Sequence, residues 1–185
     1  IGTDTNWKSI SSGQYHLLAL KNDNTIWTCG ANVFGELGLG TQIETPIITQ
    51  MGLLNNWKHI FSRGWHSIAI NQNGELWTWG LNNWGQLGDN TLIDKLIPTQ
   101  IGIGEIWYSA NSGGLFSMFL NQNKELYSCG SNWLGALGDS TYVSKDTLTN
   151  IALNSCNPES ITDINDEINS ISIYPNPANR FVSFT

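Results

Sequence analysis

The chain has 185 residues, enough for one or two domains. Its 15 acidic and 8 basic residues give a net charge of −7, which disfavours electrostatic binding to nucleic acid and to anionic lipid. Only 12% of residues are charged, whereas 9 are tryptophan and 19 are glycine, a composition typical of β-structure with tight turns. No apolar run approaches the roughly 18 residues of a membrane-spanning helix.

A step of 50 residues repeats along residues 1–152 and is set by Trp7, Trp57 and Trp107. A constant period of this length is typical of repeat architectures, so we predict repeats at about 1–50, 51–100 and 101–152. Other positions keep the same register, namely Gly30, Gly80 and Gly130; Asn32, Asn82 and Asn132; Gly35, Gly85 and Gly135; Leu37, Leu87 and Leu137; Gly38, Gly88 and Gly138; and Thr41, Thr91 and Thr141.

The middle copy shows which elements one repeat contains. Apolar and β-branched patterns predict strands over 57–60, 66–70, 75–79 and 95–101. Asn71–Gly74 carries an Asn-Gly hairpin signal, and residues 80–88 form a glycine-rich loop. About four strands per repeat, without a helical pattern, favour the blade of a β-propeller over a helical solenoid.

Three segments of the middle copy, Gly64–Ile70, Leu76–Gly80 and Asn82–Gly88, resemble the regulator of chromosome condensation repeat. The likeness recurs three times in register. A kelch repeat has a similar length, but it needs a diglycine followed by spaced tyrosine and tryptophan, and only Gly113-Gly114 is present. The resemblance implies an all-β fold, with these blades as an open partial arc of a seven-bladed propeller.

An open arc leaves two blade faces without a partner. Ile1-Gly2 corresponds to Met51-Gly52 and Ile101-Gly102, and the N-terminus lacks the basic and apolar segments of a signal peptide. We therefore expect further repeats and a signal peptide upstream, or assembly of the arc with other arcs. For the isolated arc we expect marginal stability or self-association.

The region after the repeats changes in composition. Residues 153–170 are polar and acidic and are predicted to form a linker. Residues 171–185 resemble the start of a type IX secretion C-terminal sorting domain (type A), a truncated β-sandwich. The residues that carry this resemblance are Tyr174, Pro175, Asn176, Pro177 and Ala178.

The alternative interpretation of this motif is an ordinary proline turn before a strand. The resemblance implies export across a bacterial outer membrane, to the cell surface or the medium. Its implied partners are the secretion machinery and a sortase-like peptidase.

Residues that often carry chemistry are better explained by structure. His16 and His66 share a repeat position with Phe116, so we interpret this as a packing position. The repeated glycine spacing lacks the Gly-Lys-[Ser/Thr] ending of a phosphate loop and is interpreted as left-handed turns. Cys29 and Cys129 are expected to be small apolar residues on buried strands. We predict no catalytic set, metal site or cofactor.

Aromatic residues in the glycine-rich loops are the candidate binding residues. Each copy carries one large ring there, at Phe34, Trp84 and Trp133, the last one position earlier in its repeat. Loops at one end of a propeller lie side by side, so these rings are predicted to form an apolar rim, with Tyr15 and Trp65 as further candidates. The alternative is that each ring packs on the neighbouring blade, and full burial of all three would exclude binding.

Three functions follow from these observations. The leading prediction is a secreted or cell-surface propeller, not an enzyme, that binds an unknown protein or carbohydrate through its loop face. The second is a guanine-nucleotide exchange factor, which the resemblance implies but which fits poorly with an export motif. The third is an accessory module of an exported enzyme whose catalytic domain lies upstream.

Overall fold

A computed structural model describes residues 4–151, and the predicted linker and sorting motif lie outside these residues. The described part is all β, with no helix that could span a membrane. Its strands, in chain order, are β1 (Trp7–Ser12), β2 (His16–Lys21), β3 (Ile26–Gly30), β4 (Thr45–Gln50), β5 (Trp57–Ser62), β6 (His66–Asn71), β7 (Leu76–Gly80), β8 (Lys95–Ile101), β9 (Trp107–Ser112), β10 (Phe116–Asn121), β11 (Leu126–Gly130) and β12 (Lys145–Asn150).

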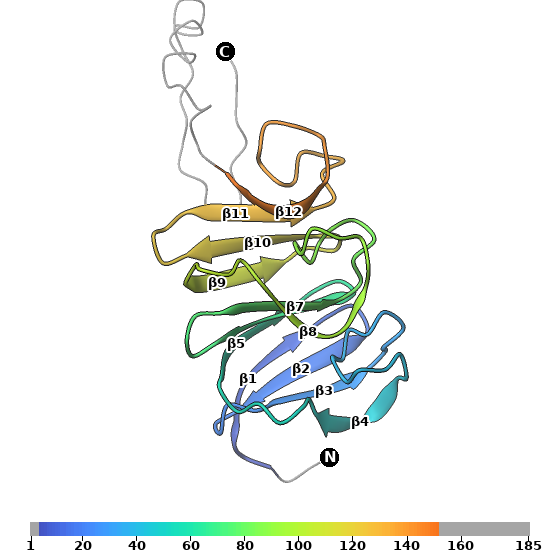
Figure 1. Cartoon of the computed structure of the whole chain (residues 1–185). Helices are drawn as coiled ribbons and strands as arrows, with labels where there is room; N and C mark the ends of the chain where they lie inside the picture. The colour runs from blue at the N-terminus through green and yellow to red at the C-terminus, as the bar shows by residue number, and fades with distance from the viewer. Residues whose placement is uncertain (1–3, 152–185) are drawn as a thin grey trace, which may run out of the picture. The chain divides into compact units, whose positions relative to one another are not determined.

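The strands form three four-stranded antiparallel sheets, which follow one another in Figure 1 from blue through green to orange. Blade 1 contains β1–β4, blade 2 contains β5–β8 and blade 3 contains β9–β12, each in simple sequential order. All three blades belong to one compact unit. The prediction of all-β propeller blades in a 50-residue register is confirmed.

The second strand of each blade shows why the blades stack. All six residues of β6, in blade 2, are buried, because blades 1 and 3 cover its two faces. In β10 of blade 3, burial alternates instead, and Phe116, Met118 and Leu120 are only half-buried. Among residues 4–151, blade 2 therefore covers one face of blade 3, and no blade covers the other face.

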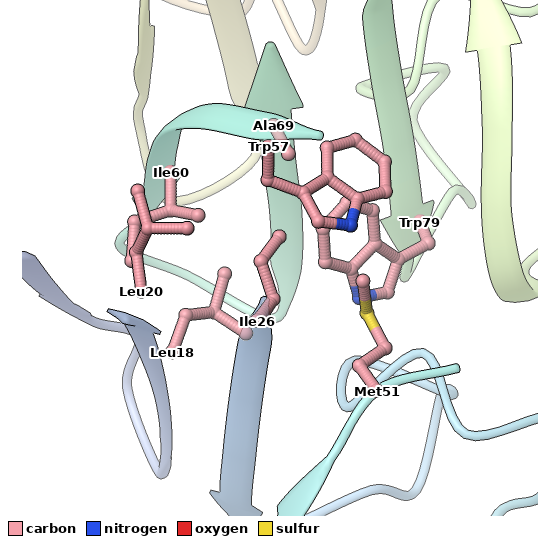
Figure 2. Close-up of a cluster of buried hydrophobic side chains, with 8 residues drawn as sticks. All are labelled: Leu18, Leu20, Ile26, Met51, Trp57, Ile60, Ala69 and Trp79. Carbon is pink, nitrogen blue, oxygen red and sulfur yellow. The ribbon is translucent and has the colours of Figure 1, made fainter. Parts of the chain in front are cut away.

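The core consists of two clusters that lie between successive blades. Figure 2 shows the first, in which side chains of blades 1 and 2 point toward one another. Its members are Leu18, Leu20, Ile26 and Met51 from blade 1 and Trp57, Ile60, Ala69 and Trp79 from blade 2. Every member of the second cluster lies 50 residues further on, namely Ile68, Ile70, Leu76, Ile101, Trp107, Ala110, Phe119 and Cys129.

The hairpin between the second and third strands also repeats. Gly74 has a φ of +79°, and its counterparts Asn24 and Lys124 have φ values of +62° and +68°. Glycine and asparagine adopt this left-handed conformation at low cost, whereas lysine pays a steric penalty. The Asn-Gly turn predicted at Asn71–Gly74 is confirmed, and its geometry holds in all three blades.

Candidate binding face at the loop end

The first and third strands of every blade end at the same end of the sheet, because neighbouring strands are antiparallel. We call this the loop end. It comprises the short turns at 13–15, 63–65 and 113–115 and the long loops at 31–44, 81–94 and 131–144. All five aromatic residues predicted as binding residues lie on these segments.

A buried asparagine organises each long loop. Asn82 donates from Nδ2 to the carbonyl oxygens of Thr91 (2.9 Å) and Ile93 (3.2 Å), and its Oδ1 accepts the Leu87 N–H (2.9 Å). Asn32 and Asn132 make the same bonds one repeat earlier and later. Because a buried amide with these partners fixes both sides of the loop, each loop holds one shape without help from a ligand.

Glycines bring each long loop against the next blade. Gly35 has a φ of +82°, and a Cβ there would lie 2.6 Å from the Leu96 Cα of blade 2. Close by, the Gly40 N–H donates to the Leu96 carbonyl (2.9 Å), and between blades 2 and 3 the Asn90 N–H donates to the Asp146 carbonyl (2.9 Å). The predicted left-handed glycine turns are confirmed, and they also permit close contact between blades.

Three of the predicted rings form one group, where blades 1 and 2 meet. The centroid of Trp65 lies 5.1 Å from that of Tyr15 and 5.5 Å from that of Phe34. Tyr15 is 61% exposed, while Phe34 and Trp65 are half-buried. Tyr15 is therefore the accessible ring of this group, and the other two support it.

The other two rings form a second group, where blades 2 and 3 meet. Trp84 and Trp133 lie edge to face with centroids 4.5 Å apart, and Trp133 is 63% exposed. The described ring contacts thus fall into two groups rather than one continuous rim, because blade 3 carries Leu115 where blade 2 carries Trp65. None of the three long-loop rings is fully buried, so binding stays a prediction.

A hollow of about 330 Å³ opens beside Trp84. It is lined by Asn83, Trp84, Leu92, Ser144 and Asp146. Between blades 1 and 2, Leu96 stands at the position that corresponds to Asp146. Its side chain lies against Gly35. Repetition does not reveal this hollow, because Ser144 and Asp146 have no counterparts of the same kind in the other repeats.

Carboxylates close the long loops of blades 2 and 3. Asp89 accepts hydrogen bonds from the Thr91 N–H (3.1 Å) and Asn82 Nδ2 (2.9 Å) and pairs with Lys95 Nζ (2.9 Å). Burial tends to raise the pKa of Asp89, but these hydrogen bonds outweigh it and hold the pKa below its ordinary value. Asp139 repeats the arrangement, whereas blade 1 has Leu39. The carboxylates therefore shape turns.

Sequence reasoning missed a histidine–serine pair that joins each blade to the next. His16 Nε2 lies 2.9 Å from Ser67 Oγ, and that hydroxyl donates to the Glu36 carbonyl (2.8 Å). His66, Ser117 and Gln86 repeat these contacts at 2.8 and 2.8 Å. Since the serine hydrogen goes to the carbonyl, the histidine Nε2–H is the donor to the serine. The signal in the sequence was a serine 51 residues after His16 and again 51 residues after His66.

A serine–histidine pair is also the beginning of a nucleophilic site. Here Ser67 and Ser117 are fully buried, and no substrate reaches their hydroxyl groups. Burial lowers the pKa of His16 to about 4 and that of His66 to about 3, so both rings are neutral at pH 7. The pairs are structural, in line with the predicted packing position.

The backbone carbonyls of Glu36 and Gln86, which we call the acceptor carbonyls, each accept a second bond from the next blade. Trp79 Nε1 donates to the Glu36 carbonyl (2.9 Å), and Cys129 Sγ lies 3.4 Å from the Gln86 carbonyl. Cys129 is buried as expected, and burial raises the pKa of its thiol. Cys29 is only half-buried, because it lies on the side of blade 1 that no other described blade covers. Both thiols are free.

Metal ligands do not gather in the part of the chain that the structure describes. Residues 4–151 contain no group of three histidine, cysteine, aspartate or glutamate side chains placed to hold a metal ion. The candidate sorting residues Tyr174–Ala178 lie outside the described part.

Comparison with known families identifies the repeat. Residues 73–120 match the profile of the regulator of chromosome condensation (RCC1) repeat, and residues 7–36 and 59–86 match a second profile of this repeat. The chain carries RCC1 repeats. A search of curated proteins finds no match.

Solved structures give the same architecture for the RCC1 repeats. Yeast RCC1 (Prp20), in a complex with Kap60, superposes with a TM-score of 0.75 at 22% identity over 82% of this chain. Prp20p of Saccharomyces cerevisiae, studied for its binding to Gsp1p and histones, gives 0.72 at 23%, and human WBSCR16 gives 0.72 at 21%. This chain spans 38% of the first structure and 39% of the other two. At these identities the likeness shows the fold.

Proposed function

We propose that the loop end of these RCC1 repeats binds a protein partner. The observation that carries the proposal is the exposure of Tyr15 and Trp133 on loops whose shape is fixed from within. Exposed aromatic rings on rigid loops provide large contact area at low entropic cost, as in interface hot spots. The hollow beside Trp84 supplies an adjacent recess with the polar groups of Asn83 and Asp146.

A protein ligand is favoured over a carbohydrate because a protein of the same fold has been studied with protein partners. The yeast protein of the same fold has been crystallised with Kap60 and studied with Gsp1p and histones. A carbohydrate remains the second class of ligand, because a tryptophan beside a carboxylate and an amide suits a sugar ring as well. Export through the motif at Tyr174–Ala178 is part of the proposal, and it would place the partner outside the cell or on its surface.

The test compares variants at the two ends of the blades. The chain, Tyr15→Ala/Trp133→Ala and the control Leu53→Ala are immobilised and exposed to surface proteins of the producing cells and to a panel of polysaccharides. Leu53 is 95% exposed but lies on the connection between blades 1 and 2, at the opposite end. We expect a protein that binds the chain and the control but binds the double variant at least tenfold more weakly. Equal binding by all three would contradict the proposal, and a polysaccharide with this pattern would favour the second class.

Nucleotide exchange is the second candidate function, since Prp20p was studied with Gsp1p. It is tested by following release of fluorescent GDP from purified Gsp1p with and without the chain. We expect the chain not to accelerate GDP release. If the wild-type chain accelerates GDP release and Tyr15→Ala/Trp133→Ala does not, nucleotide exchange would replace partner binding as the function of the loop end. The accessory-module prediction is tested separately, by determining the coding sequence upstream of residue 1.

A further inference from the structure

The hollow beside Trp84 contains an acidic side chain that the loops around it do not use. Trp84 lines the hollow from the long loop of blade 2 and Asp146 lines it from β12 of blade 3, and both residues are half-buried. The main-chain carbonyl of Asp146 accepts the Asn90 N–H, but its carboxyl group has no hydrogen-bond donor and no cation as a partner among residues 4–151. The structure of the loops therefore does not explain this carboxylate.

The long loops of blades 2 and 3 take the side-chain acceptor that they need from another position. Asp94 accepts the Asn82 N–H in blade 2 (2.7 Å), and Ser144 accepts the Asn132 N–H in blade 3 (3.2 Å). Ser144 stands at the same repeat position as Asp94, so blade 3 fills this role without a charge. The carboxylate of Asp146, two residues further along the chain, is thus additional to the hydrogen bonds that hold the loop.

The lysines of the same two loops are already paired with other carboxylates. Lys95 Nζ lies 2.9 Å from Asp89, and Lys145 Nζ lies 3.7 Å from Asp139. Asp146 therefore keeps its negative charge without a neighbouring cation from these loops. The net charge of −7 of the whole chain adds to the negative potential and favours cationic ligands.

An aromatic wall stands beside the carboxylate. Trp84 lines the hollow, and the ring of Trp133 stands edge to face with it at a centroid distance of 4.5 Å. Indole attracts cations over its ring face more strongly than the other aromatic side chains do. Leu92 adds apolar surface to the lining, and Asn83 adds an amide. The hollow thus matches the charged head and the apolar stem of a long basic side chain.

The size and chemistry of the hollow favour a single arginine side chain. Its volume of about 330 Å³ lies at the lower end of the range of ligand pockets, roughly 300–1,000 Å³. Arginine suits this lining better than lysine, because its planar guanidinium can stack on an indole and donate two parallel hydrogen bonds to a carboxylate.

We propose that the hollow between blades 2 and 3 receives an arginine side chain of the partner protein. Its guanidinium pairs with the Asp146 carboxylate and stacks on Trp84, and the side-chain carbonyl of Asn83 is a further acceptor. This inference rests on the proposed function, because it names the side chain that the loop end recognises. The partner then presents an arginine on its contact surface, and its binding weakens as salt is added.

A small probe tests the hollow separately from the partner. N-acetyl-arginine methylamide is titrated into the isotope-labelled chain, and the indole N–H signals are followed by NMR. Trp84→Phe and Trp133→Phe assign the two signals concerned. We expect saturable shifts of these signals with a Kd on the order of 1 mM, since one side chain offers few contacts. The citrulline analogue, which has a similar shape and no charge, should produce no shifts.

Variants of the carboxylate test its role. Asp146→Asn removes the charge with little change in shape and should weaken binding of the probe about tenfold. Asp146→Leu introduces the residue that the first junction has at Leu96, so it should abolish binding without disturbing the blades. Glu44→Gln is the matched control, because it removes an exposed carboxylate from the long loop of blade 1, and it should bind as wild type. Near-ultraviolet circular dichroism checks that every variant is folded.

Three results would each overturn the proposal. They are the absence of a saturable shift with the arginine probe, binding of the citrulline or lysine analogue that is as tight, and equal binding by wild type and Asp146→Asn. The proposed function would survive any of them if a protein still distinguishes the wild-type chain from Tyr15→Ala/Trp133→Ala. Conversely, probe binding with the expected pattern of variants, but without a captured protein, would support arginine recognition and contradict the proposed function.

Discussion

The interface between blades 1 and 2 and the interface between blades 2 and 3 have the same backbone and different side chains. In both, a serine of the later blade donates to an acceptor carbonyl and pairs with a buried histidine. The second donor is an indole at Trp79 in the first interface and a thiol at Cys129 in the second. The comparison teaches that a main-chain carbonyl is the constant part of the contact between blades. It accepts hydrogen bonds from side chains of different size.

The same comparison explains the hollow at the loop end. Leu96 fills the space beside Gly35 in the first interface, and Asp146 leaves the corresponding space open in the second. Both interfaces keep the glycine and the main-chain hydrogen bond that bring the blades together. A constant frame therefore allows the surface of one junction to change without disturbing the stacking of the blades.

The largest effect is expected from Trp79→Ala. Trp79 is fully buried in the first cluster, so truncation removes a large apolar side chain and one of the two bonds to the Glu36 carbonyl. We expect the free energy of unfolding to fall by about 3–5 kcal/mol. Cys129→Ala removes only a sulfur atom at the equivalent place and should cost about 1 kcal/mol. Urea denaturation of the two variants measures both, and equal losses would refute the difference between the interfaces.

Acid is expected to weaken both interfaces. The pKa values of His16 and His66 in the folded chain are about 4 and about 3, below the ordinary value of 6.5. The unfolded chain therefore binds more protons below pH 6.5, and stability is lost as the pH falls from 6.5 toward 4. Between pH 7 and pH 5 we expect each histidine to contribute a loss of about 1–2 kcal/mol.

A matched variant isolates this contribution. Burial raises the pKa of Glu36, so this carboxyl acts in the opposite direction over part of the range, and the wild-type curve is a sum. His66→Phe/Ser117→Leu replaces the second polar pair by the apolar residues that stand at the corresponding repeat positions, Phe116 and Leu17. Denaturation at several pH values should show a shallower acid dependence for this variant. An unchanged dependence would mean that His66 does not remain neutral in the folded chain.

Removal of a single serine is expected to have an intermediate effect. Ser67→Ala leaves the His16 Nε2–H without a partner and removes one bond to the Glu36 carbonyl, at a cost of about 1–3 kcal/mol. Ser117→Ala should cost somewhat less, because His66 Nε2 also lies 3.0 Å from Ser112 Oγ. Thermal unfolding of both variants tests this order, and a larger loss for Ser117→Ala would contradict it.

The smallest effect is expected in the long loops. Asp89→Leu introduces the residue that blade 1 has at Leu39 and removes bonds to Thr91, Asn82 and Lys95. Since Lys95 is partly exposed and the loop keeps its central asparagine, we expect a loss of about 1 kcal/mol. Asp139→Leu should cost less, because its pair with Lys145 is longer, at 3.7 Å. Differential scanning calorimetry with both variants distinguishes these losses.

The fold was accessible from the sequence because three copies in register reveal which positions are constrained. The step from Trp7 to Trp57 and Trp107, together with the glycines at 30, 80 and 130, predicted the blades, and the strand at Lys95–Ile101 coincides with β8. Strand ends were less accurate, since β5 continues to Ser62 beyond the predicted end at residue 60. Its last residues, Phe61 and Ser62, pair with Ile68 and Ser67 of β6.

The candidate site was accessible only in part. Repetition pointed to the loop aromatics, but whether Trp133 contacts Trp84 depends on the direction of its ring across a blade junction, which no local pattern contains. The histidine–serine pairs were missed for a related reason. Within one repeat His66 is followed by Ser67, yet each of the two residues bonds to a different neighbouring blade. Periodicity identifies equivalent positions, and contacts between them require the stacking geometry.

The acceptor carbonyls have a consequence for how such a chain can change over time. A main-chain carbonyl is present whatever residue stands at position 36, 86 or 136, so no substitution there deletes it. A blade copied or exchanged by recombination would therefore arrive with its attachment point intact, and only the donor on the following blade would need to fit. Glutamate, glutamine and alanine at the three positions are what such a modular joint permits, and new surfaces can be added blade by blade.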